Sequence, residues 1–170
     1  MRRIAFLSHI DVNLYLFRLH IMKKLKIKNW DVFAIIPEGK YFNKFSKYSI
    51  KTVSYKISRK SFNPLKEIKV ILELTKILGS LKPHIIHTYV VKSNIYGSIA
   101  SRIAHIPIVI NSITGLGSFY TENTKKAIFI RKIIGFLYKF SFSYSKKVVF
   151  QNPDDLVYFI EKSIIPIDKA

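Results

Sequence analysis

Residues 3–36 read RIAFLSHIDVNLYLFRLHIMKKLKIKNWDVFAII, and this stretch decides the fold. Arg3–Ser8 and Trp30–Ile36 are short apolar runs that predict strands. Between them, Val12–Lys28 carries Leu14, Phe17 and other apolar residues at helical spacing. Strand, helix and strand in this order predict a right-handed βαβ unit with parallel strands.

The same alternation continues along the chain. Further strands are predicted at Ile50–Ile57, His84–Tyr89, Pro107–Ile113 and Lys147–Phe150, and helices at Tyr41–Lys47, from Pro64 onward, at Asn94–Ala104, at Thr124–Ser143 and from Asp154. This pattern predicts an α/β chain with an open, doubly wound parallel sheet, Rossmann-like, in a single domain over residues 1–170. In such sheets ligands bind beyond the carboxyl ends of the strands, so functional residues are expected in the loops that follow each strand.

Composition narrows the class of protein. The 170 residues include 29 Lys and Arg against 10 Asp and Glu, a formal net charge of +19, yet 49% are apolar, which argues against disorder. The absence of cysteine excludes a disulfide scaffold and cysteine-based zinc sites. The charge makes polyanions the expected partners, although heavy use of Lys, Ile, Asn, Phe and Tyr is also what AT-rich coding produces.

Neither a signal peptide nor an uncharged stretch of about 18 apolar residues is found, so a cytoplasmic chain, soluble or on a membrane surface, is expected.

The predicted loop after the first strand, residues 8–13, lacks the G-x-G-x-x-G fingerprint of dinucleotide-binding domains. The chain also lacks a P-loop. His9 could act as a general base or contact a phosphate, or it could simply end the strand. Asp11 and Asn13 suit the N-cap of the next helix.

Two later loops carry polar or flexible residues. Lys92, Ser93 and Asn94 precede a predicted helix, where they suit either an anion or ordinary N-capping. The 114–117 loop contains two glycines that would let the backbone approach a ligand. His84 and His87 are expected on opposite sides of their strand, so no metal site is predicted.

The predicted helix at Thr124–Ser143 carries a basic stripe. Lys125, Lys132 and Lys139 recur every seven residues, and Arg131 lies off that stripe. A basic helix rich in aromatic residues is typical of contact with an anionic membrane, and the same pattern suits a packed helix with a solvated lysine edge.

The loop strings together resemble a known family. They are FLSHIDVNLYLFR (residues 6–18), SRKSFNP (58–64), KSNIYGSIASRIAHIP (92–107), TGLGSFY (114–120) and FQNPDD (150–155). In this order they resemble the N-terminal domain of retaining glycosyltransferases of family 4, and within it the bacterial subgroup that adds N-acetylhexosamine to undecaprenyl-diphosphate-linked sugars.

The resemblance implies one half of a GT-B fold: the acceptor-side domain, with the C-terminal donor-binding domain absent. A UDP-sugar would be the donor substrate, and no cofactor or metal is expected. The implied binding residues are Ser8, His9, Asp11 and Asn13 beside the cleft, Lys92, Ser93 and Asn94 on the acceptor side, and Thr114, Gly115 and Gly117 in a closing loop. The implied membrane-facing residues are Lys125, Arg131, Lys132 and Lys139. Relatives often place a histidine after the fourth strand, where this chain has Tyr89 and Val91, so no catalytic residue is assigned.

The expected function is that of an acceptor-side domain. The complete enzyme would transfer a sugar, N-acetylhexosamine, from a UDP-sugar to a polyprenyl-diphosphate-linked glycan. Its expected partners are the donor-binding half, the lipid-linked acceptor and an anionic membrane at the inner face of the cytoplasmic membrane, and the chain is expected to be inactive alone. The alternative is a non-catalytic subunit, or the remnant of a truncated glycosyltransferase. Nucleic-acid binding is not expected, because no recognised motif accompanies the charge.

Overall fold

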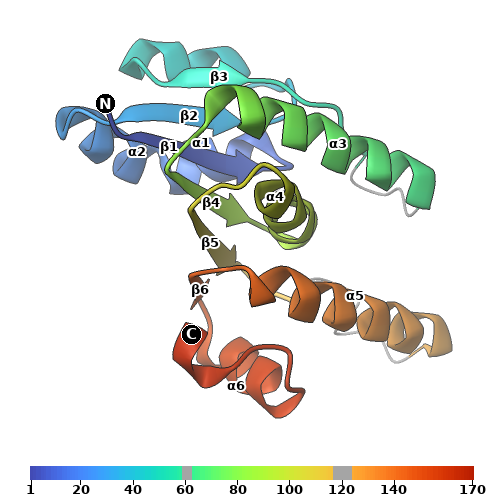
Figure 1. Ribbon diagram of the computed structural model, residues 1–170. Coiled ribbons are helices and arrows are strands. Elements are labelled where there is room, and N and C mark those ends of the chain that lie inside the picture. Colours follow the sequence, from blue (N-terminus) through green and yellow to red (C-terminus); the bar gives the residue numbers. More distant parts are fainter. Residues whose placement is uncertain (59–62, 117–123) are drawn as a thin grey trace.

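The computed structural model describes residues 1–58, 63–116 and 124–170 (Figure 1). Six parallel strands form one sheet in the order β3-β2-β1-β4-β5-β6. The strands are β1 (Arg3–Ser8), β2 (Asp31–Ile35), β3 (Lys51–Val53), β4 (Ile85–Tyr89), β5 (Ile108–Ile113) and β6 (Lys147–Phe150). The helices are α1 (Asp11–Phe17), α2 (Leu19–Ile27), α3 (Pro64–Leu81), α4 (Val91–Ile103), α5 (Lys125–Ser143) and α6 (Pro153–Glu161), with the 3₁₀ turns η1 (Phe42–Tyr48) and η3 (Ile167–Lys169). The predicted doubly wound parallel sheet is confirmed.

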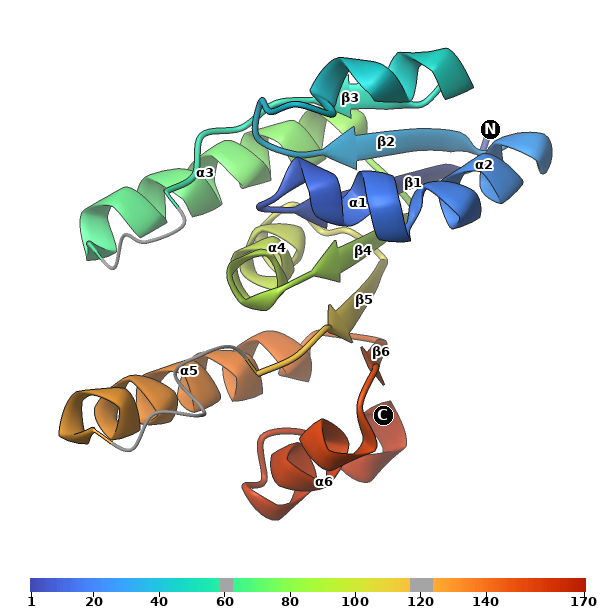
Figure 2. The same cartoon turned by 180° about the vertical axis from the view of Figure 1, so that it is seen from behind.

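Helices cover the two faces of the sheet unequally. Figure 1 shows α3, α4 and α5 on one face, and Figure 2 shows α1 and α2 on the other. Side chains alternate between these layers along β1, since Ala5 and Leu7 join the core under α3 and α4, while Ile4 and Phe6 join the core under α1 and α2. In a third apolar cluster, side chains of β6 pack against those of α5 and α6.

Two predicted elements differ from those in the structure. The helix predicted at Val12–Lys28 is two helices that meet at Arg18, whose backbone leaves the helical region (φ −126°, ψ −10°). The strand predicted at Ile50–Ile57 pairs only over Lys51–Val53. Its partner β2 ends at Ile35, and the Ile36 N–H makes the last hydrogen bond across the pair, to the Val53 carbonyl at 3.1 Å, so residues beyond Val53 have no strand beside them.

The helix predicted to begin at Asn94 begins at Val91 instead. It follows β4 after a single residue, Val90, which has a positive φ of 65° and turns the chain sharply. The residues predicted to form a loop before this helix therefore lie in its first turn.

Small residues let α4 pack directly on the sheet. Gly97, Ser98, Ala100 and Ser101 are all buried. A Cβ at Gly97 would lie 2.5 Å from Cδ2 of Leu7 and 2.8 Å from Cγ2 of Thr88, so only glycine fits at this approach. These small side chains therefore bring α4 close to β1 and β4.

Candidate functional site

The carboxyl ends of β1 and β4 meet at the centre of the sheet. Ser8 ends β1 and pairs with Tyr89, which ends β4. From there the chain continues into α1 on one face and into α4 on the other (Figures 1 and 2). Strand order reverses at this point, and open α/β sheets bind ligands in the crevice outside such a switch. We call this region the switch-point edge.

Asp11 ties the loop after β1 to the loop after β2. Its Oδ2 accepts a hydrogen bond from the Tyr41 backbone N–H at 2.7 Å, and its Oδ1 accepts one from the Val12 N–H at 2.8 Å. Gly39 packs against the same carboxylate, because a Cβ there would lie 2.5 Å from Oδ2. The N-cap of α1 is Ile10, so Asp11 sits one position inside the helix that it was predicted to cap.

The other predicted residues of this loop are less exposed than the sequence suggests. Ser8 is fully buried, and its hydroxyl accepts from the Ile10 N–H at 3.2 Å and donates to the Ile10 carbonyl at 3.0 Å. Ser8 therefore shapes the turn. His9 and Asn13 are half-buried. Asn13 Oδ1 is buried and has no hydrogen-bond partner within the described ranges.

The start of α4 is strained and has no side-chain cap. Val90 combines a φ of 65° with a ψ of 158°, a region of backbone space that is nearly restricted to glycine. The N-cap residue, Val90, makes no side-chain hydrogen bond to the first turn of α4. Backbone strain often marks a functional site, and an uncapped helix N-terminus suits an anionic group.

Lys92 and Ser93, in this first turn, are both buried. Lys92 Nζ lies 2.9 Å from Oε1 of Glu67 on α3 and donates to the Ser58 carbonyl at 2.8 Å. This ion pair holds α3 against α4. The Ser93 hydroxyl lowers the pKa of Tyr55, although burial dominates and raises that pKa overall. Tyr55 in turn donates to the Ser8 carbonyl at 3.3 Å, so the loops after β1 and β3 meet here.

Asn94 belongs to a buried polar network and has no exposed surface. Its Oδ1 accepts from the Thr88 hydroxyl at 2.6 Å, and its Nδ2 donates to the Ser112 carbonyl at 2.9 Å. Asn111 extends the network through Nδ2, which donates to Thr88 Oγ1 at 2.6 Å and to Ser98 Oγ at 2.8 Å. The network fixes α4 on β4 and β5. The alternative that Ser93 or Asn94 caps this helix is wrong, because the N-cap is Val90.

His87 on β4 has a polar environment that the sequence analysis missed. Its Nδ1 lies 2.9 Å from the Tyr89 hydroxyl and its Nε2 lies 2.8 Å from the Ser112 hydroxyl. The Arg18 guanidinium stacks on the Tyr89 ring, 4.8 Å from its centroid. Burial, and secondarily the Arg18 charge, lower the pKa of His87 to about 4. The spacing of His87 and Tyr89, two residues apart in one strand, was the available signal that both face one side.

Two further loops reach the same edge of the sheet. Thr114 is half-buried and Gly115 is exposed with a φ of 125°, a conformation that favours glycine. Gly117 lies outside the described residues. After β6, Asp155 is buried in the first turn of α6, and burial together with Asp154 raises its pKa. The helix dipole favours acidic residues in a first turn, so residue type alone gives no sign that Asp155 faces inward.

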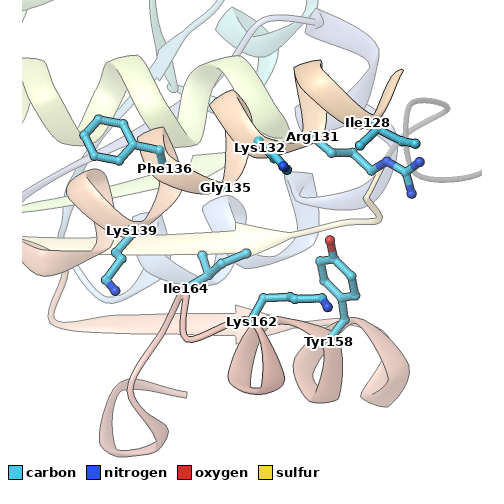
Figure 3. Close-up of a pocket in the computed structure, with 9 residues that line it drawn as sticks. All are labelled: Ile128, Arg131, Lys132, Gly135, Phe136, Lys139, Tyr158, Lys162 and Ile164. Carbon is cyan, nitrogen blue, oxygen red and sulfur yellow. The ribbon is translucent and has the colours of Figure 1, made fainter. Parts of the chain in front are cut away.

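The predicted membrane-facing residues lie elsewhere, on α5. Lys125, Lys132 and Lys139 are exposed, and Arg131 is half-buried. Three of the four line a groove between α5 and α6: Arg131, Lys132 and Lys139 (Figure 3). The structure therefore divides the predicted residues between the switch-point edge and this groove.

Residues 1–58, 63–116 and 124–170 contain neither a cluster of metal-ligating side chains nor a helix able to cross a membrane. No three histidine or acidic side chains gather as a metal ion would require. None of the described helices combines the length and the apolar character needed to span a bilayer.

Solved structures share this fold. Acinetobacter baumannii MurG is similar with a TM-score of 0.64 and 15% identity, over 91% of this chain and 43% of that one. Anabaena Alr3699/HepE in complex with UDP and glucose gives a TM-score of 0.66 and 14% identity, over 95% of this chain and 41% of that one. The fold is thus Rossmann-like, one half of a GT-B fold.

Two relatives found by sequence share a higher identity with this chain than the solved structures above. The chain is 38% identical over 150 residues to N,N'-diacetylbacillosaminyl-diphospho-undecaprenol alpha-1,3-N-acetylgalactosaminyltransferase of Campylobacter jejuni, covering 88% of this chain and 40% of the relative. It is 36% identical over 75 residues to UDP-Gal:alpha-D-GlcNAc-diphosphoundecaprenol alpha-1,3-galactosyltransferase of Escherichia coli, covering 44% of this chain and 17% of the relative. The pattern of the family described as Glycosyl transferase 4-like matches residues 3–152. The chain belongs to this family of glycosyltransferases.

Proposed function

We propose that this chain is the acceptor-side domain of an enzyme that transfers an N-acetylhexosamine from a UDP-sugar to a polyprenyl-diphosphate-linked glycan. The observation that carries the proposal is the 38% identity over 88% of the chain to the Campylobacter enzyme. That enzyme and the Escherichia coli relative are named for different transferred sugars, but both names specify an undecaprenol diphosphate acceptor. The part of the relatives that this chain matches is therefore proposed to hold the acceptor.

The switch-point edge offers suitable chemistry for such an acceptor. Backbone N–H groups in the first turn of α4 suit an anionic group, since their N-cap residue Val90 supplies no side-chain hydrogen bond. In this proposal His9, Asp11, Thr114 and Gly115 border the acceptor, while Ser8, Lys92 and Asn94 hold the loops in place from within the fold. GT-B enzymes stabilise the leaving diphosphate with protein groups and helix dipoles, so no metal or cofactor is proposed.

The donor-binding half is proposed to be a further domain or subunit. The chain spans 40% of the length of the Campylobacter relative. Acceptor and donor must meet within one cleft for transfer, so the 170 residues alone are expected to transfer little or no sugar. Because the acceptor carries a lipid, the complete enzyme is placed peripherally at the inner face of the cytoplasmic membrane.

A chimera tests this proposal. Residues 1–170 are joined to the remaining C-terminal part of the Campylobacter enzyme and assayed in detergent with a panel of UDP-sugars and undecaprenyl-diphosphate-linked acceptors. We expect transfer by the chimera and none by either half. Robust turnover by the isolated chain, or a folded chimera that is inactive with every pair of substrates, would contradict the proposal.

A further inference from the structure

We propose that the edge of the sheet opposite the switch-point edge is a docking surface for an acidic protein. All strand pairs are parallel, so the amino ends of the strands lie together on that side. We call it the amino-end edge. It consists of the residues that precede or begin the six strands, namely 1–3, 28–31, 48–51, 82–85, 105–108 and 144–147. Figure 2 shows this side of the sheet on the right, where both chain ends lie.

Basic side chains stand at the base of nearly every strand. Arg2 precedes β1, Lys28 precedes β2, Lys51 begins β3, Lys82 precedes β4 and Lys146 precedes β6. All five residues are exposed. Neighbouring strands lie about 4.8 Å apart, so these residues cross the sheet as a row of positive charge.

Acidic side chains are scarce along the same row. Asp31 is the one acid among the described residues that define the amino-end edge, and its Oδ1 lies 2.9 Å from Lys51 Nζ. By contrast, Asp11, Glu38 and Asp155 follow β1, β2 and β6 at the carboxyl ends of those strands. Opposite charges therefore gather at opposite edges of the sheet, whereas a bias in coding would spread lysine over both.

Helix dipoles explain part of this arrangement. Lysines in the last turn of a helix complement its dipole, and Lys24 and Lys26 lie in the last turn of α2. Arg2 and Lys146 lie outside every described helix. The row of positive charge therefore extends beyond the positions that a dipole favours.

The lysines of this row can meet carboxylates from another molecule. Lys28, Lys82 and Lys146 take no part in the ion pairs of the described residues. Lys82 is also the C-cap of α3, with a φ of 46°, a conformation that favours glycine. Glycine at this position would remove the charge without straining the backbone.

Exposed apolar side chains at the same side favour a protein as the partner. Met1 is 90% exposed, and Ile27 and Ile103, the last residues of α2 and α4, are 80% and 51% exposed. Protein interfaces combine apolar contacts with complementary charge around them. These three residues come from separate elements, so they do not form the continuous apolar face of a helix that lies in a membrane.

A nucleic acid fits this edge less well. Proteins that bind single strands stack the bases on aromatic side chains. The aromatic rings of the amino-end edge are half-buried and already in contact, since Arg2 lies over Trp30 and the Tyr144 hydroxyl donates to the Ile106 carbonyl. The observations therefore favour carboxylates on a protein over phosphates on a nucleic acid. Such a partner would leave the switch-point edge open.

Fluorescence anisotropy tests the proposal with the 170-residue chain and a labelled oligoglutamate peptide as the probe. We expect binding that weakens with added NaCl, because salt screens exposed charges. The triple variant Lys28→Gln, Lys82→Gly, Lys146→Gln should raise the dissociation constant roughly tenfold or more, since it breaks the row at three strands. Urea denaturation checks that its stability is kept.

The matched control is Lys66→Gln, Lys69→Gln, Lys76→Gln, which removes the same charge from exposed positions on α3. It should raise the dissociation constant less than about threefold, because it changes only the net charge. Ser49→Gly is the control for the backbone change, since Ser49 has a φ of 55° at the same edge and carries no charge. It should leave the dissociation constant unchanged.

The proposal is overturned by absent peptide binding, or by equal losses in the two lysine triples, which would leave net charge as the cause. Tighter binding of oligothymidylate that depends on the same three lysines would assign the edge to a nucleic acid. Binding to phosphatidylglycerol vesicles that is lost in the same triple would assign it to a bilayer. None of these results depends on sugar transfer, so failure here is distinguishable from failure of the chimera.

Discussion

Gly97 has no side chain, and this lets α4 approach the sheet closely. Gly97→Ala places a Cβ 2.5 Å from a Leu7 side-chain carbon and 2.8 Å from one of Thr88. Both neighbours are buried, so neither can move freely, and we expect a loss of about 1–3 kcal/mol in the free energy of unfolding. Urea denaturation measures it.

The control is Gly79→Ala on α3, where nothing lies within 4 Å of the new Cβ. A glycine inside a helix is less favourable than alanine, so this variant should gain about 0.5–1 kcal/mol. If both alanines shift the urea midpoint in the same direction, steric contact at α4 is not the cause.

His87 makes stability depend on pH. Burial holds its pKa at about 4 in the folded chain, against an ordinary value of 6.5. The unfolded chain therefore binds more protons between these values, so the free energy of unfolding falls as the pH drops from 6.5 toward 4. The expected loss is on the order of 2 kcal/mol for a group of this burial.

The measurement compares urea midpoints at pH 7 and pH 5. His87→Gln should remove part of the difference, while His20→Gln, at an exposed histidine, should leave it unchanged. An identical pH dependence in all three proteins would show that carboxylates alone produce it.

At the scale of single residues, the polar residues near the strand ends could be found from the sequence, but their hydrogen-bond partners and burial could not. Ser8 and Asn94 were expected to bind ligands because both lie at strand ends, and both are buried in hydrogen bonds within the fold. Serine and asparagine serve equally in turns, networks and ligand contacts, and residue type does not distinguish these uses. His87 was missed because its partners Tyr89 and Ser112 come from the strand itself and from its neighbour.

At the scale of single helices, α4 and α5 begin differently. α5 has Thr124 as its N-cap, whose hydroxyl accepts from the Ala127 N–H at 3.1 Å, whereas α4 has no side-chain cap. Thr124→Ala should therefore cost about 1 kcal/mol in the free energy of unfolding, measured by thermal or urea denaturation.

Thr124→Ser supplies the control, because it keeps the oxygen that accepts this bond. It should retain most of the stability, and Ser143→Ala at the exposed C-terminal end of α5 should have little effect. Equal losses in Thr124→Ala and Thr124→Ser would show that the methyl group, and not the cap, matters.

The order and type of the elements could be predicted from the sequence because apolar periodicity differs between strands and helices. The residues at which the strands and helices begin and end could not be predicted in this way. The strand from Ile50 stops at Val53 since its partner β2 has already ended, a limit set by a segment remote in the sequence. The early start of α4 depends on the φ of Val90, which a β-branched residue does not suggest.

At the scale of the whole molecule, one part of the sheet remains uncovered. Parallel sheets are normally buried on both faces. Figure 2 shows α1 and α2 over β1 on the rear face, and no helix of the described part over β5 and β6. On these two strands Ile108 is 37% exposed and Val149 is 47% exposed. Val149 pairs with Ser112, four residues along β5 from Ile108, so both side chains lie on the same face of the sheet. Exposed apolar side chains on an uncovered sheet face favour association with another apolar surface.

We therefore expect the isolated chain to self-associate at high concentration through this face. Ile108→Thr with Val149→Thr keeps β-branched side chains, which suit strands, and replaces the apolar surface with hydroxyls. Sedimentation velocity should show this variant shifted toward monomer, with little change in the urea midpoint. Val157→Thr removes apolar surface from α6, at a residue that is 52% exposed, and should leave association unchanged. If the strand variant associates as strongly as the parent chain, the open face is not the surface responsible, and exposed apolar side chains on helices, such as Phe136 on α5 and Leu65 on α3, are the next surfaces to vary.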